Sequence, residues 1–131
     1  MFRNTDRFVA ELRPEEPARF NPERLEDLCR RIGETRAEVE VARALDRIST
    51  TLGALPQLSD GGDASVLRAG LTTLIRDADL IGMATLARVA RDVAHCLDNG
   101  DDRGRAATTA RLIRVGDRSI HAVWELEDVS G

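Results

Sequence analysis

The chain has 131 residues and a mass of 14.4 kDa, which is the size of one domain with a single core. Hydrophobic residues make up 42% of it but aromatic residues only 3%, so we expect an interior of leucine, isoleucine, valine and alanine. The net charge is −4, and the 19 basic residues, all arginine, are spread along the chain without a basic block. This distribution argues against a nucleic-acid-binding surface.

Signals for export, membrane insertion and disulfide formation are weak. The first residues, Met-Phe-Arg-Asn-Thr-Asp-Arg, lack an apolar leader, and no run approaches the roughly 18 apolar residues that cross a bilayer. Cys29 and Cys96 are too few and too far apart for a disulfide framework or a metal knuckle. We therefore expect a cytoplasmic protein without membrane contact, in which both thiols are reduced and buried as small hydrophobic side chains.

Residues 1–20 are expected to form an N-terminal arm, separate from a helical domain over residues 21–131. Pro14 and Pro17 interrupt the arm, because proline lacks a backbone N–H and clashes with the preceding helical turn. A short helix is possible before them, with an apolar face made by Phe2, Phe8, Val9 and Leu12.

The first helix of the domain is predicted to begin at Asn21-Pro22-Glu23. Asparagine is a good N-cap, proline suits the first helical position, and an acid is favourable near the positive end of the helix dipole. Gly33 predicts the end of this helix, since glycine readily adopts the left-handed conformation. The apolar stripe between these two signals consists of Leu25, Leu28, Cys29 and Ile32.

A longer helix is predicted from about residue 35 to residue 52. The segment from Leu55 to Gly62 contains a proline, a serine, an aspartate and two glycines, and we predict that it is a loop. Asp63 can cap the helix that follows. The apolar stripe of the long helix has heptad-like spacing and consists of Val41, Leu45, Ile48, Leu52 and Leu55.

The helix predicted over residues 67–82 has two different faces. Its apolar stripe, expected to face the core, consists of Leu67, Leu71, Leu74, Ala78 and Ile81. At about 100° per residue, a polar stripe lies roughly 140° away from it and consists of Ser65, Arg68, Thr72, Arg76 and Asp79. The polar stripe is centred on Thr72 and should face solvent, which makes it the candidate site.

Two more helices complete the predicted fold. Gly82 ends or kinks the central helix, and a helix over about residues 86–97 then stops at Asn99-Gly100. The last helix is predicted over about residues 103–126, with Gly116 as a point where it could bend. Period-two alternation rich in β-branched residues is absent, so no sheet is expected. Short connections between the four long amphipathic helices that follow residue 34 predict an all-α, antiparallel, up-down four-helix bundle.

Three segments of the sequence are similar to a known family. They are Phe20–Leu28 followed by Ile32-Gly33-Glu34, then Asp63–Arg68, and finally Leu80-Ile81-Gly82 with Leu86, Ala87 and Ala90. Through them the chain from Phe20 to about Ile120 resembles histidine-containing phosphotransfer (Hpt) domains, the four-helix bundles that relay phosphoryl groups between receiver domains in bacterial two-component signalling. The resemblance implies the same fold and, as partner, a response-regulator receiver domain or a sensor histidine kinase.

The phosphoacceptor of that family is missing here. The family motif reads His, any residue, Leu, Lys, Gly, and the matching positions are Thr72, Thr73, Leu74, Ile75 and Arg76. A phosphorelay needs an imidazole, because a phosphoramidate is labile enough to pass its group onward whereas a hydroxyl forms a stable ester. The resemblance therefore implies a degenerate domain that is not an enzyme and needs no cofactor.

The candidate partner-binding residues surround Thr72 and are Arg68, Thr72, Ile75, Arg76 and Asp79. Arg68 and Arg76 stand one helical turn to either side of Thr72, and their charges suit the acidic pocket of a receiver domain. The alternative interpretation is an ordinary solvated face on which Arg76 pairs with Asp77 or Asp79. Such exposed pairs contribute about 0–1 kcal/mol.

The two histidines of the chain offer a second chemistry. His95 lies off the apolar stripe, with Asp92 and Asp98 one helical turn away on either side. It is either a surface histidine that interacts with neighbouring acids or a relocated phosphoacceptor.

A metal site and a purely structural role are the remaining alternatives. Asp117, His121 and Glu125 have i, i+4 and i+8 spacing, but this arrangement is unspecific and we expect no metal site. A structural or oligomerisation bundle unrelated to phosphotransfer would have the same helix pattern. The sequence does not set the oligomeric state.

Overall fold

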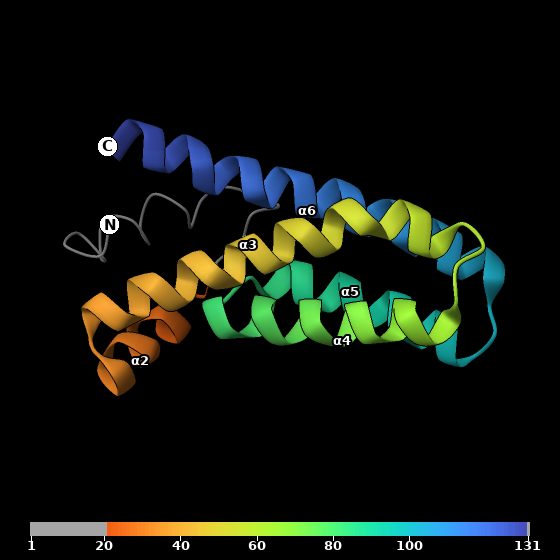
Figure 1. Ribbon diagram of the computed structural model, residues 1–131, viewed down its shortest axis with the longest axis horizontal. Helices are drawn as coiled ribbons and strands as arrows, with labels where there is room; N and C mark the ends of the chain where they lie inside the picture. Colours follow the sequence, from red (N-terminus) through yellow and green to blue (C-terminus); the bar gives the residue numbers. More distant parts are fainter. Residues whose placement is uncertain (1–20, 131) are drawn as a thin grey trace.

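The computed structural model describes the backbone of residues 21–130 and the side chains of residues 21–123. Within that range all five regular elements are helices, which confirms the predicted all-α class (Figure 1). They are α2 (Pro22–Ile32), α3 (Glu34–Ser59), α4 (Ala64–Ile81), α5 (Ala84–Asp98) and α6 (Asp102–Ser130). The predicted arm over residues 1–20 lies outside the described residues. None of the described helices combines the length and the apolar composition that a membrane span requires.

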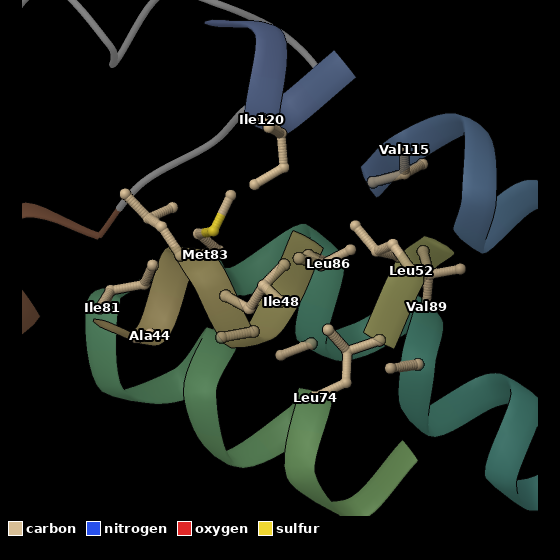
Figure 2. Close-up of a cluster of buried hydrophobic side chains, with 14 of the residues drawn as sticks. Ala44, Ile48, Leu52, Leu74, Ile81, Met83, Leu86, Val89, Val115 and Ile120 are labelled. Carbon is tan, nitrogen blue, oxygen red and sulfur yellow. The ribbon is translucent and has the colours of Figure 1, made fainter. Parts of the chain in front are cut away.

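The four long helices lie side by side around one core. Helix α3 contacts α4 and α6, α5 contacts the same two helices, and α2 packs against α3 and α4 near one end (Figure 1). The described core is aliphatic, as composition predicts, and one part of it is drawn in Figure 2. There, side chains from α3, α4, α5 and α6 meet, among them Ile48, Leu52, Leu74, Leu86 and Ile120.

The predicted helix ends are set by local capping. The Asn21 Oδ1 atom accepts a hydrogen bond from the Glu23 N–H at 3.0 Å, which caps α2. The Asp63 Oδ1 atom accepts from the Ser65 N–H at 2.8 Å, which caps α4 and lowers the pKa of the Asp63 carboxyl. Gly82 ends α4 in the left-handed conformation, with φ of +81°.

The predicted loop over residues 55–62 is wrong for most of its length. Helix α3 continues to Ser59 with Pro56 inside it, and only residues 60–63 separate α3 from α4. Leu55 is fully buried and Leu58 packs against the core. Burial of these leucines holds the last turns helical, although Pro56 removes one backbone hydrogen bond.

Gly116 is a contact point between helices. Helix α6 is one continuous element through this position. A Cβ atom added to Gly116 would lie 2.5 Å from the Cδ1 atom of Leu52 on α3. The glycine therefore permits α3 and α6 to approach closely, a role that its low helix propensity alone does not reveal.

The two thiols are less buried than predicted. Cys29 and Cys96 are free, but both are half-buried because they lie at the edges of the apolar faces of α2 and α5. Partial burial raises the pKa of the Cys29 thiol, and the nearby carboxylates of Glu34, Glu38 and Glu26 raise it further.

Candidate functional site

Helix α4 is amphipathic in the predicted register. All five members of its apolar stripe are fully buried, namely Leu67, Leu71, Leu74, Ala78 and Ile81. On the polar stripe, Ser65, Arg68, Thr72 and Arg76 are exposed, whereas Asp79 is half-buried. The candidate site is therefore a solvent-facing surface on the outer side of α4.

Thr72 lies at the middle of this surface with its hydroxyl engaged locally. The Thr72 Oγ1 atom donates a hydrogen bond of 3.0 Å to the backbone carbonyl of Arg68, one turn earlier in the same helix. This bond is common for threonine within helices. Because no base of the described part accepts the hydroxyl proton, nothing in this geometry activates Thr72 as a nucleophile.

Ile75 and Arg76, which the resemblance aligns with a lysine and a glycine, differ in how far they are exposed. Ile75 is half-buried and packs against the core, so only part of its surface can meet a partner. The Arg76 side chain is 70% exposed, and its Nε atom lies 3.9 Å from the Asp77 Oδ1 atom. The predicted alternative pairing of Arg76 with Asp77 thus exists as a long contact, and most of the guanidinium remains accessible.

Asp77 has a second partner that the sequence analysis missed. It is 1% exposed, and its carboxylate accepts two hydrogen bonds of 3.0 Å, from the Nε and Nη2 atoms of Arg47 on α3. These bonds raise the pKa of the Arg47 guanidinium, against a smaller opposing effect of burial. The sequence does show an acidic residue, Asp77, beside Ala78 at the edge of the apolar stripe, which is a signal for a buried ion pair. It does not identify the partner, Arg47, which lies 30 residues away.

Two further ion pairs tie α4 to α5. Arg68 pairs with Asp98, and Asp79 pairs with Arg91. Both pairs are largely exposed, so each stabilises the fold only slightly. They show that two predicted partner-binding residues already have partners within the chain, which the sequence analysis did not predict. We call the exposed surface between the two pairs the α4/α5 seam.

His95 belongs to the α4/α5 seam. Arg91, His95 and Asp98 have i, i+4 and i+7 spacing and therefore share one stripe of α5. Since the outer two pair with Asp79 and Arg68, His95 lies between the two ion pairs, alongside the α4 segment that contains Thr72. The imidazole is exposed, and its Nε2 atom lies 3.0 Å from the Nδ2 atom of Asn99. Its hydrogen-bond partner is thus an amide rather than one of the neighbouring acids.

The described side chains contain no cluster of three possible metal ligands. Asp117 and His121 are both exposed on α6. The third member of the predicted arrangement, Glu125, lies outside the described side chains, so the arrangement as a whole stays untested.

Comparison with protein-family models, with curated proteins and with solved structures gives no match for this chain. The likeness to Hpt domains therefore rests on the residues quoted from the sequence. The structure adds the surroundings of those residues, and these surroundings form the basis of the functional proposal.

Proposed function

We propose that this chain is a degenerate Hpt-like domain that acts as a non-catalytic adaptor in bacterial two-component signalling. In this proposal residues 21–131 form the domain, α3 to α6 form an antiparallel up-down four-helix bundle, and the protein is cytoplasmic. Its partner is a response-regulator receiver domain or a sensor histidine kinase. The observation that supports it most is an exposed Thr72 at the middle of α4, where the resemblance expects the phosphoacceptor histidine.

The proposed lack of catalysis follows from the chemistry at that position. The Thr72 hydroxyl has a very high pKa in water and is bonded to its own helix, so it is a poor phosphoacceptor. A phosphate ester formed there would be too stable to pass its group to an aspartate. The surface can still contact the domains that a phosphorelay protein meets, because contact requires shape and charge rather than an imidazole.

In the proposed complex Arg76 is the main electrostatic contact. It is the most exposed charged side chain among the candidate residues, and its only ion-pair contact in the described part is the long one to Asp77. Arg68 and Asp79 are held by their pairs with α5 and shape the surface instead. A rim charge of this kind affects association rate and salt dependence more than fold stability.

A charge reversal tests this proposal. Arg76→Glu should weaken binding to receiver domains by about three- to tenfold at low salt, with little change in melting temperature. Arg43→Glu is the matched control, because Arg43 is similarly exposed on α3 and, among the described side chains, pairs only with Glu40, three residues away. Binding would be measured by titration against a panel of purified receiver and kinase domains. Equal affinities of both variants and the wild type would remove the α4 surface from the proposal.

His95 supports a second candidate function, an active phosphotransferase with a relocated acceptor. The observation that favours it is the position of His95 beside the same α4 segment, with an exposed imidazole. Incubation with a phosphorylated receiver separates the candidates. Acid-labile label that is lost in His95→Gln and kept in His121→Gln would establish transfer, whereas binding without label supports the adaptor. If the protein neither binds the receiver nor carries label, the remaining candidate is a structural or oligomerisation bundle.

A further inference from the structure

The outer surface of α4 has one edge toward α5 and one edge toward α3. Arg68 and Asp79 lie on the α5 edge, because each forms an ion pair with a residue of that helix. Asp77 lies on the α3 edge, because it accepts two hydrogen bonds from Arg47. At about 100° per residue, Arg76 projects between the two edges. A partner that contacts Arg76 can therefore also contact either neighbouring helix.

Arg47 and Arg76 share one carboxylate at the α3 edge. The Asp77 Oδ1 atom lies 3.0 Å from the Arg47 Nη2 atom and 3.9 Å from the Arg76 Nε atom, so the two guanidinium groups are neighbours. At the α5 edge each guanidinium has a carboxylate of its own, because Arg68 and Arg91 pair with different aspartates. Within ion-pair distance, positive charge is thus in excess at the α3 edge and balanced at the α5 edge.

The two arginines of the α3 edge also keep hydrogen-bond donors for a partner. A guanidinium has five N–H donors, and Asp77 accepts only from the Nε and Nη2 atoms of Arg47, whose side chain is 41% exposed. Arg76 is more exposed still, and its contact with Asp77 is too long for a hydrogen bond. Because the Asp77 carboxylate is itself buried, an approaching acid meets the donors rather than this carboxylate.

Thr72 is level with the α3 segment that begins at Arg47. Asp77 lies opposite Arg47, and a Cβ atom added to Gly70 would lie 3.8 Å from the Cγ2 atom of Thr51. Thr72 stands between residues 70 and 77, so the facing part of α3 is residues 47–51. A partner centred on Thr72 and Arg76 therefore has Arg47 within its reach.

Two acids of α3 lie near Arg47. Glu40 pairs with Arg43 at 3.4 Å, one turn from Arg47 in the direction away from residues 47–51. Asp46 is exposed on the outer surface of α3 and, among the described side chains, forms no ion pair with Arg47. Its charge opposes the approach of an acidic partner, which provides a further test below.

We propose that Arg47 is a second partner-contact residue, so that a receiver domain lies across α4 and α3 and places neighbouring carboxylates on Arg76 and Arg47. This inference rests on the proposed adaptor function, which supplies the acidic partner. The bidentate bond to Asp77 already orients the Arg47 guanidinium, so the contact loses little side-chain entropy on binding.

Neutralising single charges tests this contact. Arg47→Gln removes the charge but keeps an amide donor for Asp77, and Arg91→Gln makes the same change of net charge at the α5 edge. At low salt Arg47→Gln should weaken receiver binding about threefold, which is more than the effect of Arg91→Gln, and the difference should shrink as salt is added. Arg47→Lys should keep most of the affinity. Thermal melting of each variant checks that it is folded.

A gain of affinity gives a second test that misfolding cannot imitate. Asp46→Asn removes the opposing carboxylate beside Arg47 and should strengthen receiver binding about twofold at low salt. Asp117→Asn makes the same change on the exposed surface of α6 and should leave the affinity unchanged.

The outcomes separate this inference from the adaptor function. If Arg76→Glu weakens binding while Arg47→Gln and Asp46→Asn leave it unchanged, the second contact is wrong and the adaptor function stands. A larger loss in Arg91→Gln than in Arg47→Gln would place the partner toward α5 and also overturn the inference. A wild-type chain that binds no receiver domain would overturn both proposals.

Discussion

The α4/α5 seam and the contact between α3 and α6 are stabilised in different ways. Exposed ion pairs, Arg68 with Asp98 and Asp79 with Arg91, cross from α4 to α5. Between α3 and α6, Leu52 packs directly on Gly116, with a cavity beside the contact. Charges in water can be exchanged at little cost, whereas a close-packed contact cannot accept an added atom. Substitutions at the seam should therefore alter recognition, and substitutions at the α3/α6 contact should alter stability.

The largest effect is expected at Gly116. Gly116→Val adds side-chain atoms where a Cβ already lies 2.5 Å from Leu52 Cδ1, so it should lower the free energy of unfolding by about 3 kcal/mol. Urea denaturation of the variant measures this loss. Gly53→Val is the control, since a Cβ atom added to Gly53, on α3, would meet nothing within 4 Å. Similar stability of the two variants would show that the glycine contact does not limit packing.

A smaller effect is expected at the ion pair between α3 and α4. Asp77→Ala leaves the Arg47 guanidinium without its carboxylate, but Arg47 is 41% exposed and water can replace part of the interaction. The free energy of unfolding should fall by about 2 kcal/mol, below the usual loss for a fully buried pair.

A double-mutant cycle isolates the Arg47–Asp77 interaction. The double variant Arg47→Ala with Asp77→Ala should lose clearly less stability than the sum of the losses in the two single variants, because it leaves no unpaired charge. Additive losses in the cycle would mean that Asp77 acts through some contact other than Arg47.

The cap at Asp63 should make stability depend on acid pH. Its pKa is lowered in the folded chain by hydrogen bonds from Ser65, so the carboxylate stabilises α4 above the pKa of the unfolded state. That contribution is lost as the pH falls through the lower, folded-state pKa. Melting temperatures between pH 6 and pH 2 should therefore fall more steeply for the wild type than for Asp63→Asn, which keeps a neutral cap. Parallel curves would exclude this contribution.

The smallest effect is expected at the seam itself. Arg68→Ala removes an exposed pair with Asp98 and should cost less than about 1 kcal/mol, with the difference shrinking at high salt. Thermal melts at low and high salt measure both quantities. A loss comparable to that of Gly116→Val would contradict the contrast between the two regions.

Local signals made much of this fold predictable. The caps at Asn21 and Asp63, the left-handed Gly82 and the apolar stripe of α4 depend on a few neighbouring residues, and each prediction is confirmed. Helix α3 ends later than predicted, because burial of Leu55 against other helices outweighs the local effect of Pro56.

The site was only partly predictable for a related reason. Exposure of Thr72 follows from helical periodicity, which one helix determines. The partners of Asp77, Arg68 and Asp79 come from other helices, so their identity depends on how the helices align. A single sequence gives no direct information on these distant contacts.

The most direct test of the proposed function restores the family motif. In a His95→Gln background, the triple variant Thr72→His, Ile75→Lys and Arg76→Gly would place an imidazole at the middle of the exposed α4 surface. After incubation with a phosphorylated receiver domain, we predict acid-labile label on position 72 of this variant and none on the His95→Gln parent. A folded triple variant that binds the receiver yet stays unlabelled would contradict the assignment of Thr72 to the phosphoacceptor position.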